Sequence, residues 1–263
     1  PRELHPRRDS PRELGAIAAD SDVSAVLLAI DSPGGTTTGG EALYLAIEAL
    51  KAKKPVVAVY GTIATSAAYM ISLACDRVFS RGNTITGSVG VIFQYPEVHE
   101  GLAKLGIKMQ EIKSGNLKAS PSMFAPLDEP GRAVAEDMVR EGQAWFLALV
   151  QKSRKIDTKA VPGLEAGRIF SGRQALSYKL VDQIGGETAA VAWLETSKNV
   201  EKGLKIIDWK AKQPDPFGLG SLGLAGAGNR EETVVGQLVD QFTSDLGLQR
   251  LKLDGLLSLW QGR

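Results

Sequence analysis

Residues 55–77 read PVVAVYGTIATSAAYMISLACDR and join a β-branched apolar run to an apolar, helix-like segment. The run at 55–61 is typical of a strand that is buried on both faces of a sheet. At the junction Ser66 stands among small neighbours, with Thr65 before it and Ala67 after it. A core would favour a larger aliphatic side chain at this point. Ser66 is therefore either an unusual packing residue or a hydroxyl placed there for chemistry.

The alternation of strand and helix extends to both sides of this stretch. A continuous apolar run at 23–30 predicts a second buried strand, and residues 41–54 carry apolar side chains at helical spacing. Between them lies the breaker cluster DSPGGTTTGG at 31–40. This order predicts an α/β fold with a mainly parallel sheet and covering helices. We also expect strands at 77–80, 87–94 and 107–113, helices at 96–106, 129–156 and 186–199, and a strand-turn-helix unit at 167–186.

Composition divides the chain into three regions. Residues 1–210 form the α/β domain, and 211–230 are rich in Gly, Ala and Pro, which predicts a linker. Residues 231–263 are amphipathic and predict a helical tail. The chain starts with proline rather than methionine, and we expect its true N-terminus to lie further upstream. No apolar run reaches the roughly 18–20 residues of a membrane span.

The overall composition disfavours several classes of function. A hydrophobic content of 43% and a charged content of 23% are those of an ordinary globular protein. The net charge of +1 gives no support for a nucleic-acid partner. A single cysteine excludes an intramolecular disulfide and a zinc cluster. The two histidines, His5 and His99, are expected at the surface, which disfavours both a Ser–His–Asp triad and a catalytic metal.

A lysine is the alternative base for a serine nucleophile. A neutral lysine amine accepts a hydroxyl proton when burial lowers its pKa. The polar stretch EIKSGNLKASPSMFAP at 111–126 offers Lys113 and Lys118, and each of them is otherwise read as a surface charge. The residues alone leave the choice between them open.

The sequence DSPGG at 31–35, here called the glycine loop, follows the first buried strand. Consecutive glycines allow the backbone to approach a ligand and to direct N–H groups at developing negative charge. A helix that begins after Ser66 would add the free N–H of Ala67. The glycine loop is therefore a candidate oxyanion site, with a simple tight turn as the alternative.

Five blocks of sequence occur in an order that resembles a known family. They are IDSPGG at 30–35, IATSAAYMISLACDRVFS at 63–80, TGSVGV at 86–91, IKSGNLKAS at 112–120 and GRIFSGRQALSYKLVDQIGG at 167–186. Together they resemble the signal peptide peptidases of the SppA type, which are Ser–Lys serine proteases that share the fold of Clp protease and crotonases. The resemblance covers roughly residues 15–200, and it implies a Clp protease/crotonase-like fold for the α/β domain.

The resemblance assigns roles to individual residues. It implies that Ser66 is the nucleophile and that Lys118, at the end of an SG-x-x-K turn, is the base rather than Lys113. Their separation of 52 residues (118 − 66) fits the half-length bacterial form of the family. It also implies an oxyanion hole formed by the N–H groups of Gly35, then Gly34, and of Ala67. Ser88 is expected either to orient the lysine or to stabilise its own turn.

The sequence departs from the family pattern at two places. The usual Ser-Gly-Gly-Tyr is Ser66-Ala67-Ala68-Tyr69 here, which keeps the backbone N–H groups but adds two methyl groups beside the pocket. Tyr178 and Lys179 stand where the family usually has a glycine-leucine pair, a difference that concerns packing rather than chemistry.

The resemblance implies an endopeptidase that needs no cofactor and hydrolyses remnant signal peptides or other apolar peptides. It also implies a ring-shaped homo-oligomer in which a neighbouring subunit supplies the lysine. A membrane anchor is expected upstream, with the protein at the bacterial inner membrane and its catalytic domain on the periplasmic side. Three alternatives stay open: a phage-type capsid maturation protease with the same chemistry, a crotonase-like acyl-CoA enzyme, and a catalytically inactive scaffold.

Overall fold

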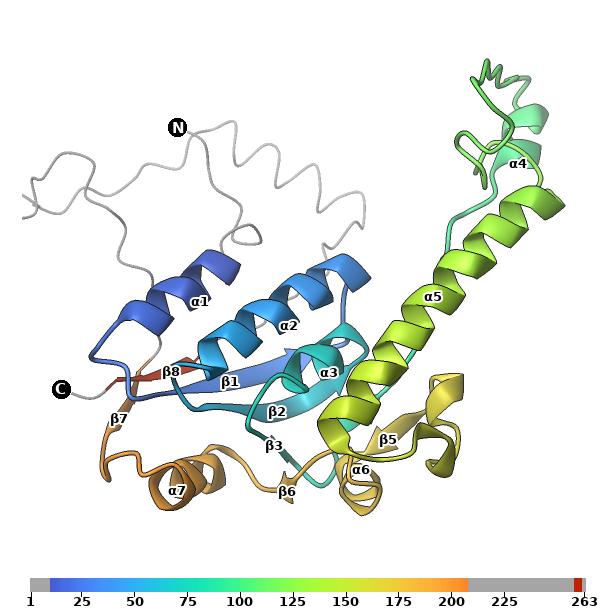
Figure 1. Ribbon diagram of the computed structural model, residues 1–263. Helices are drawn as coiled ribbons and strands as arrows, with labels where there is room; N and C mark the ends of the chain where they lie inside the picture. The colour runs from blue at the N-terminus through green and yellow to red at the C-terminus, as the bar shows by residue number, and fades with distance from the viewer. Residues whose placement is uncertain (1–9, 208–257, 262–263) are drawn as a thin grey trace, which may run out of the picture. The chain divides into compact units, whose positions relative to one another are not determined.

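The computed structural model describes residues 10–207 and 258–261, which form one mixed sheet with helices around it (Figure 1). The strands are β1 (Ala25–Ser32), β2 (Val56–Thr65), β3 (Arg77–Ser80), β4 (Ile85–Gly87), β5 (Ile169–Ser171), β6 (Gln183–Ile184), β7 (Lys205–Ile207) and β8 (Ser258–Gln261). The helices are α1 (Ser10–Ala19), α2 (Thr37–Lys51), α3 (Ala67–Ser72), α4 (His99–Lys104), α5 (Glu129–Arg154), α6 (Gly172–Ser177) and α7 (Glu187–Ser197), with short 3₁₀ turns at Thr158–Ala160 and Leu164–Ala166.

The sheet is parallel at its centre, and it divides along β2. One side of β2 pairs with β1, while its other side pairs first with β3 and then with β4, all in parallel. β6 extends the β3 branch in parallel, and β5 extends the β4 branch in an antiparallel sense. Beyond β1, β8 and β7 add antiparallel pairs. The parallel centre follows the strand–helix alternation of the sequence, as predicted.

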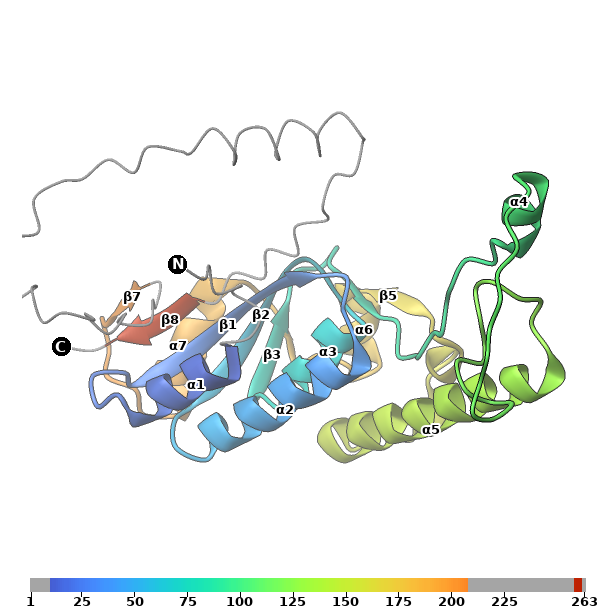
Figure 2. The same cartoon turned by 90° about the horizontal axis from the view of Figure 1, so that it is seen from above.

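Helices cover both faces of the sheet. α1, α2 and α3 lie on one face and α7 lies on the other (Figures 1 and 2). The core under α7 combines alternate side chains of β1 and β2 with Phe79, Ala190 and Leu194, all of them buried. Each buried large apolar side chain stabilises the fold by roughly 1.5–3 kcal/mol. This packing explains why both strands read as continuous apolar runs, because each of their faces meets a helix.

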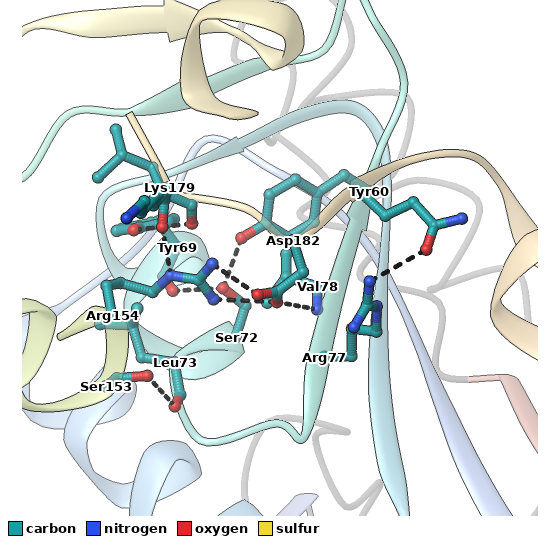
Figure 3. A network of polar contacts seen from close by, with 12 residues as sticks. Tyr60, Tyr69, Ser72, Leu73, Arg77, Val78, Ser153, Arg154, Lys179 and Asp182 are labelled. Carbon is teal, nitrogen blue, oxygen red and sulfur yellow. Dashed lines mark hydrogen bonds and ion pairs between the residues drawn. The ribbon is translucent and has the colours of Figure 1, made fainter. Parts of the chain in front are cut away.

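The long helix α5 is anchored to the sheet domain at its C-terminal end. Its first turn is capped by Asp128, whose side chain accepts a hydrogen bond from the Gly131 amide. At the other end Arg154 donates two hydrogen bonds to Asp182, at 2.8 and 3.0 Å, and a third to the Lys179 carbonyl (Figure 3). The Asp182 carboxylate also accepts from the Val78 amide of β3. One ion pair therefore ties α5 to the loop before β6 and to the sheet.

Replacing Arg154 with leucine should destabilise the protein by about 1–3 kcal/mol, because the half-buried Asp182 carboxylate would lose its charged partner. Arg140→Leu on the same helix is the matched control. Arg140 pairs with Asp137 at the surface, and losing such a pair changes stability by less than about 1 kcal/mol. Urea unfolding measures the stability of Arg154→Leu and Arg140→Leu. Equal urea midpoints for the two variants would show that the ion pair of Arg154 contributes no more to the fold than the surface pair of Arg140.

Two predicted strands are wrong in the described residues. Residues 107–113 have no strand partner, and of the predicted strand at 87–94 only Gly87 belongs to a strand, the last residue of β4. A strand needs a neighbour for its N–H and C=O groups, which alternation in the sequence does not guarantee. The segment 92–138 instead exposes nine large apolar side chains: Ile92, Phe93, Leu105, Ile107, Met109, Ile112, Leu117, Phe124 and Met138.

The predicted helical tail is also wrong where the structure describes it. Residues 258–261 form β8, which pairs with β1 and β7. The predicted linker at 211–230 and the rest of the tail lie outside the described residues. Of the helices that the structure describes, none combines the length and apolarity that crossing a membrane requires.

Candidate active site

Ser66 stands at the turn between β2 and α3 in an unusual backbone conformation. Its φ of 55° and ψ of −124° lie in a region that non-glycine residues rarely adopt, at a cost of about 1–3 kcal/mol. The turn is fixed because the Ser66 amide donates to the Gly87 carbonyl of β4 at 2.9 Å and the Ser66 carbonyl accepts from the Met70 amide. Ser66 is partly exposed, and its side chain caps no helix amide. These features favour a chemical role for the hydroxyl over a packing role.

The helix that follows Ser66 is held firmly in the core. Ala67 and Ala68 are buried, and a Cβ placed on Gly40 of α2 would lie 3.1 Å from the Ala67 Cβ, so α3 packs closely against α2. Tyr69 is fully buried and donates from its hydroxyl to the Leu180 carbonyl at 3.0 Å. Burial raises the pKa of Tyr69, which keeps this hydroxyl protonated as a donor. The rigid helix therefore fixes the direction of the Ser66 turn.

The glycine loop packs directly against Ser66. Gly34 has a φ of 117°, and a Cβ placed on it would lie 2.9 Å from the Ser66 Cβ and 3.2 Å from the Ala67 amide nitrogen. No side chain fits in this space, so the approach of the loop to the turn requires glycine at position 34. The structure thus brings together two motifs that are about 30 residues apart in the sequence.

The amides of this region differ in what they already bind. The Gly34 amide donates to the Ser32 hydroxyl at 3.2 Å. The Gly35 amide has no acceptor among the described residues, and open space surrounds its Cα. Ala67 is the first residue of α3, and its amide has no acceptor within the helix. Gly35 and Ala67 are therefore the free donors beside Ser66, and Gly34 is not.

Gly34→Ala should destabilise the fold by about 1–3 kcal/mol, because the methyl group would push the glycine loop away from Ser66. Gly35→Ala is the matched control, since its methyl group would enter open space. The free energy of unfolding of Gly35→Ala should lie within about 0.5 kcal/mol of the wild-type value. Thermal melts test the pair. A Gly34→Ala chain that melts like wild type would contradict the packing argument.

Ser88 and its neighbours border the same turn. Ser88 follows Gly87, whose carbonyl binds the Ser66 amide, and its own amide donates to the Arg168 carbonyl at 3.0 Å. Its φ of 52° is also in the left-handed region. Lys179, one of the departures from the family pattern, has a φ of 59° just after α6. This is the left-handed conformation after a helix that glycine adopts most readily.

Lys118 lies elsewhere in the described chain. It is exposed on a turn that its amide closes by donating to the Gly115 carbonyl. Two residues later, Ser120 contacts Asp128 at the N-terminal end of α5. The part of α5 that lies near the Ser66 turn is at Gln143, which donates to the Val89 carbonyl. Along α5, Asp128 and Gln143 are fifteen residues apart, which corresponds to about 22 Å.

No hydrogen bond or ion pair joins Lys118 to Ser66 in the described chain. Figures 1 and 2 show the segment between α4 and α5 away from α3. Lys113 on the same segment pairs with Glu111 at 2.6 Å. His99 pairs with Glu97 at 3.1 Å and does not approach Ser66. Within residues 10–207 and 258–261, no group of three or more His, Cys, Asp or Glu side chains is arranged to hold a metal.

Sequence reasoning did not anticipate two contacts that shape this region. The Thr65 hydroxyl donates to the Pro33 carbonyl at 2.8 Å. The Asp31 carboxylate accepts from the amides of Thr62 and Ile63, at 3.0 Å each. The available signals were a hydroxyl residue at the end of an apolar strand and a carboxylate that opens the glycine loop.

A partly exposed serine at a strained strand-to-helix turn, with free amides beside it, is the arrangement of hydrolases that use serine as a nucleophile. Residues 48–201 match the model of peptidase family S49. The match covers more than half of the chain, which therefore belongs to this family.

Individual relatives agree with this assignment. A putative protease of Synechocystis is 34% identical over 172 residues, which are 65% of this chain and 62% of the relative. The putative signal peptide peptidase SppA of Enterococcus faecium is 34% identical over 215 residues, 80% of this chain and 61% of the relative. The head-tail preconnector protein GP5 of Enterobacteria phage P21 is 30% identical over 181 residues, 69% of this chain and 36% of the relative. The chain thus matches about three fifths or less of each relative.

Proposed function

We propose that this chain is a serine endopeptidase that cleaves remnant signal peptides or other apolar peptides. The observation that carries the proposal is the strained, partly exposed Ser66 with the glycine loop packed against it. Membership of peptidase family S49 and the likeness to the Enterococcus signal peptide peptidase support both the reaction and the substrate class. A Clp protease/crotonase-like fold agrees with the parallel sheet centre that divides along β2.

In the proposed reaction Ser66 attacks the peptide carbonyl while a neutral Lys118 takes its hydroxyl proton. The Gly35 and Ala67 amides hold the oxyanion, and removing one such donor typically costs about 10²–10³ in rate. Lys118 then protonates the leaving amine. Water hydrolyses the acyl-enzyme through the same proton transfers in reverse, with Ser88 orienting the lysine.

A ring-shaped homo-oligomer would complete this site, with Lys118 delivered by a neighbouring subunit. Two observations support this part of the proposal. Lys118 is exposed and away from Ser66 in its own chain. The segment that carries it, 92–138, exposes most of the large apolar side chains that the described surface displays. We further propose an upstream membrane anchor and a catalytic domain on the periplasmic side of a bacterial inner membrane, where signal-peptide remnants arise.

Two alternative functions differ in the observations that support them. The phage P21 relative favours a capsid maturation protease with the same dyad and another substrate. A crotonase-like acyl-CoA enzyme needs a catalytic carboxylate beside the oxyanion site. Asp31 is the acidic residue of the glycine loop, and one of its carboxylate oxygens accepts from two backbone amides.

A fluorophosphonate probe tests the proposal, because it reacts with activated serine hydroxyls. We expect mass spectrometry to find the label on Ser66 and the same protein to hydrolyse a fluorogenic signal-peptide fragment. A scaffold would take up no label, and a crotonase-like enzyme would leave the peptide intact. Cleavage of a capsid scaffold sequence in preference to the signal-peptide fragment would favour the phage-type protease.

A further inference from the structure

The glycine loop is attached to β2 by side chains that stand outside the proposed dyad and oxyanion hole. We propose that Thr65 is a positioning residue, whose hydroxyl holds the glycine loop so that the Gly35 amide faces the oxyanion formed at Ser66. This inference rests on the proposed function and names a part of that site that neither the reaction nor the family assigns.

The loop leaves β1 at a point fixed by an irregularity in the sheet. Between the paired residues Ile30↔Tyr60 and Ser32↔Ala64, β1 advances by two residues and β2 by four. The two extra residues of β2 interrupt its pairing with β1, and the Asp31 carboxylate accepts from the amides of Thr62 and Ile63 at this point. A Cβ on Gly61 would lie 2.7 Å from the Asp31 carboxyl carbon, so the exposed carboxylate lies against the Gly61 backbone. This bulge brings the end of β2 beneath the loop.

Thr65 supplies the next attachment, one residue before the nucleophile. Its side chain is buried, with the residue 5% exposed, and its hydroxyl donates to the Pro33 carbonyl at 2.8 Å. The peptide between Pro33 and Gly34 is planar, so fixing its carbonyl also fixes the Gly34 amide, which donates to the Ser32 hydroxyl. Few torsions then remain before the Gly35 amide. A single hydroxyl on the strand that carries Ser66 therefore sets where the oxyanion donor lies relative to Ser66.

A donor that is displaced stabilises a transition state poorly, even when the fold is intact. Losing an oxyanion donor outright costs about 10²–10³ in rate, and a misplacement of about 1 Å costs up to about 10²-fold. A substitution that loosens the glycine loop but keeps the Gly35 amide should lower the rate by no more than these factors. We expect Thr65→Val, which keeps the β-branched shape and replaces the hydroxyl with a methyl group, to lower kcat by about 10- to 100-fold.

The experiment compares the full chain with Thr65→Val and Thr65→Ser on a fluorogenic apolar peptide. Thr65→Val should lose kcat with KM changed by less than about threefold, and Thr65→Ser should stay near wild type. The matched inhibitors are a peptide aldehyde, which forms an oxyanion-like adduct with the serine, and the corresponding alcohol, which does not. Thr65→Val should weaken the aldehyde by the factor lost in kcat/KM and leave the alcohol unchanged.

Several results would overturn the inference. They are a Thr65→Val protein with wild-type kcat, a loss confined to KM, equal losses in the valine and serine variants, or an aldehyde affinity that does not change. If Thr65→Val melts more than about 5 °C below wild type, Thr65→Ala replaces it, because it removes the same hydrogen bond without the added methyl group. A failure of the proposed function is seen separately, as a wild-type protein that does not cleave the peptide or as a Ser66→Ala variant that keeps wild-type activity.

Discussion

Replacing Ser66 with alanine should lower peptidase activity by at least about 10³-fold while the protein stays folded. Alanine removes the hydroxyl that attacks the substrate and leaves the Gly35 and Ala67 amides in place. The Ser66 side chain caps no helix, so its loss removes no capping hydrogen bond from α3. Initial rates on a fluorogenic peptide, measured beside a thermal melt, separate loss of chemistry from loss of fold.

A glycine at position 66 also tests whether the backbone there is strained. Glycine lacks the hydroxyl but adopts positive φ values without the steric cost that serine pays at 55°. We therefore expect Ser66→Gly to be as inactive as Ser66→Ala and more stable than it by about 1 kcal/mol. Activity retained in both variants would place the nucleophile elsewhere. Equal stability of the two variants would show that the backbone at residue 66 carries no strain.

The two central strands could be predicted from the sequence because their burial leaves a simple apolar signature. Residues 23–30 and 55–61 correspond to most of β1 and to the first half of β2. The prediction ended β2 too early, since its second half depends on the bulge at Asp31 and on pairing with β4. β8 was missed for a related reason. Its partners, β1 and β7, are distant in sequence, and a local pattern does not report them.

The candidate site was only partly visible in the sequence. The small residues around Ser66 and the glycine loop were found because close backbone approach restricts residue type. The strain at Ser66 and the hydroxyl contact of Thr65 depend on how β2 and β1 register, which no local pattern encodes. The position of Lys118 depends on the length and anchoring of α5.

Lys118→Ala should lower peptidase activity by about 10²–10⁴-fold, the usual contribution of a general base. Lys118 is exposed in the single chain, so its loss should change the stability of that chain by less than about 0.5 kcal/mol. Lys113→Ala is the matched control. Lys113 lies on the same segment and pairs with Glu111, so we expect this variant to keep its activity. Loss of activity in Lys113→Ala alone would assign the base to Lys113.

Mixing two inactive variants tests whether neighbouring subunits share the site. In a ring of Ser66→Ala and Lys118→Ala chains, an intact site forms where the Lys118→Ala subunit supplies Ser66 and its neighbour supplies Lys118. Random assembly of equal amounts gives such a pair at roughly a quarter of the sites, so co-expressed and doubly affinity-purified complexes should recover about that fraction of wild-type activity. If one chain supplied both residues, every site would lack one of them and activity would stay at the level of the single variants. Recovery would therefore explain why Lys118 is exposed on a segment that displays large apolar side chains and contacts α5 at Asp128, about 22 Å along the helix from Gln143.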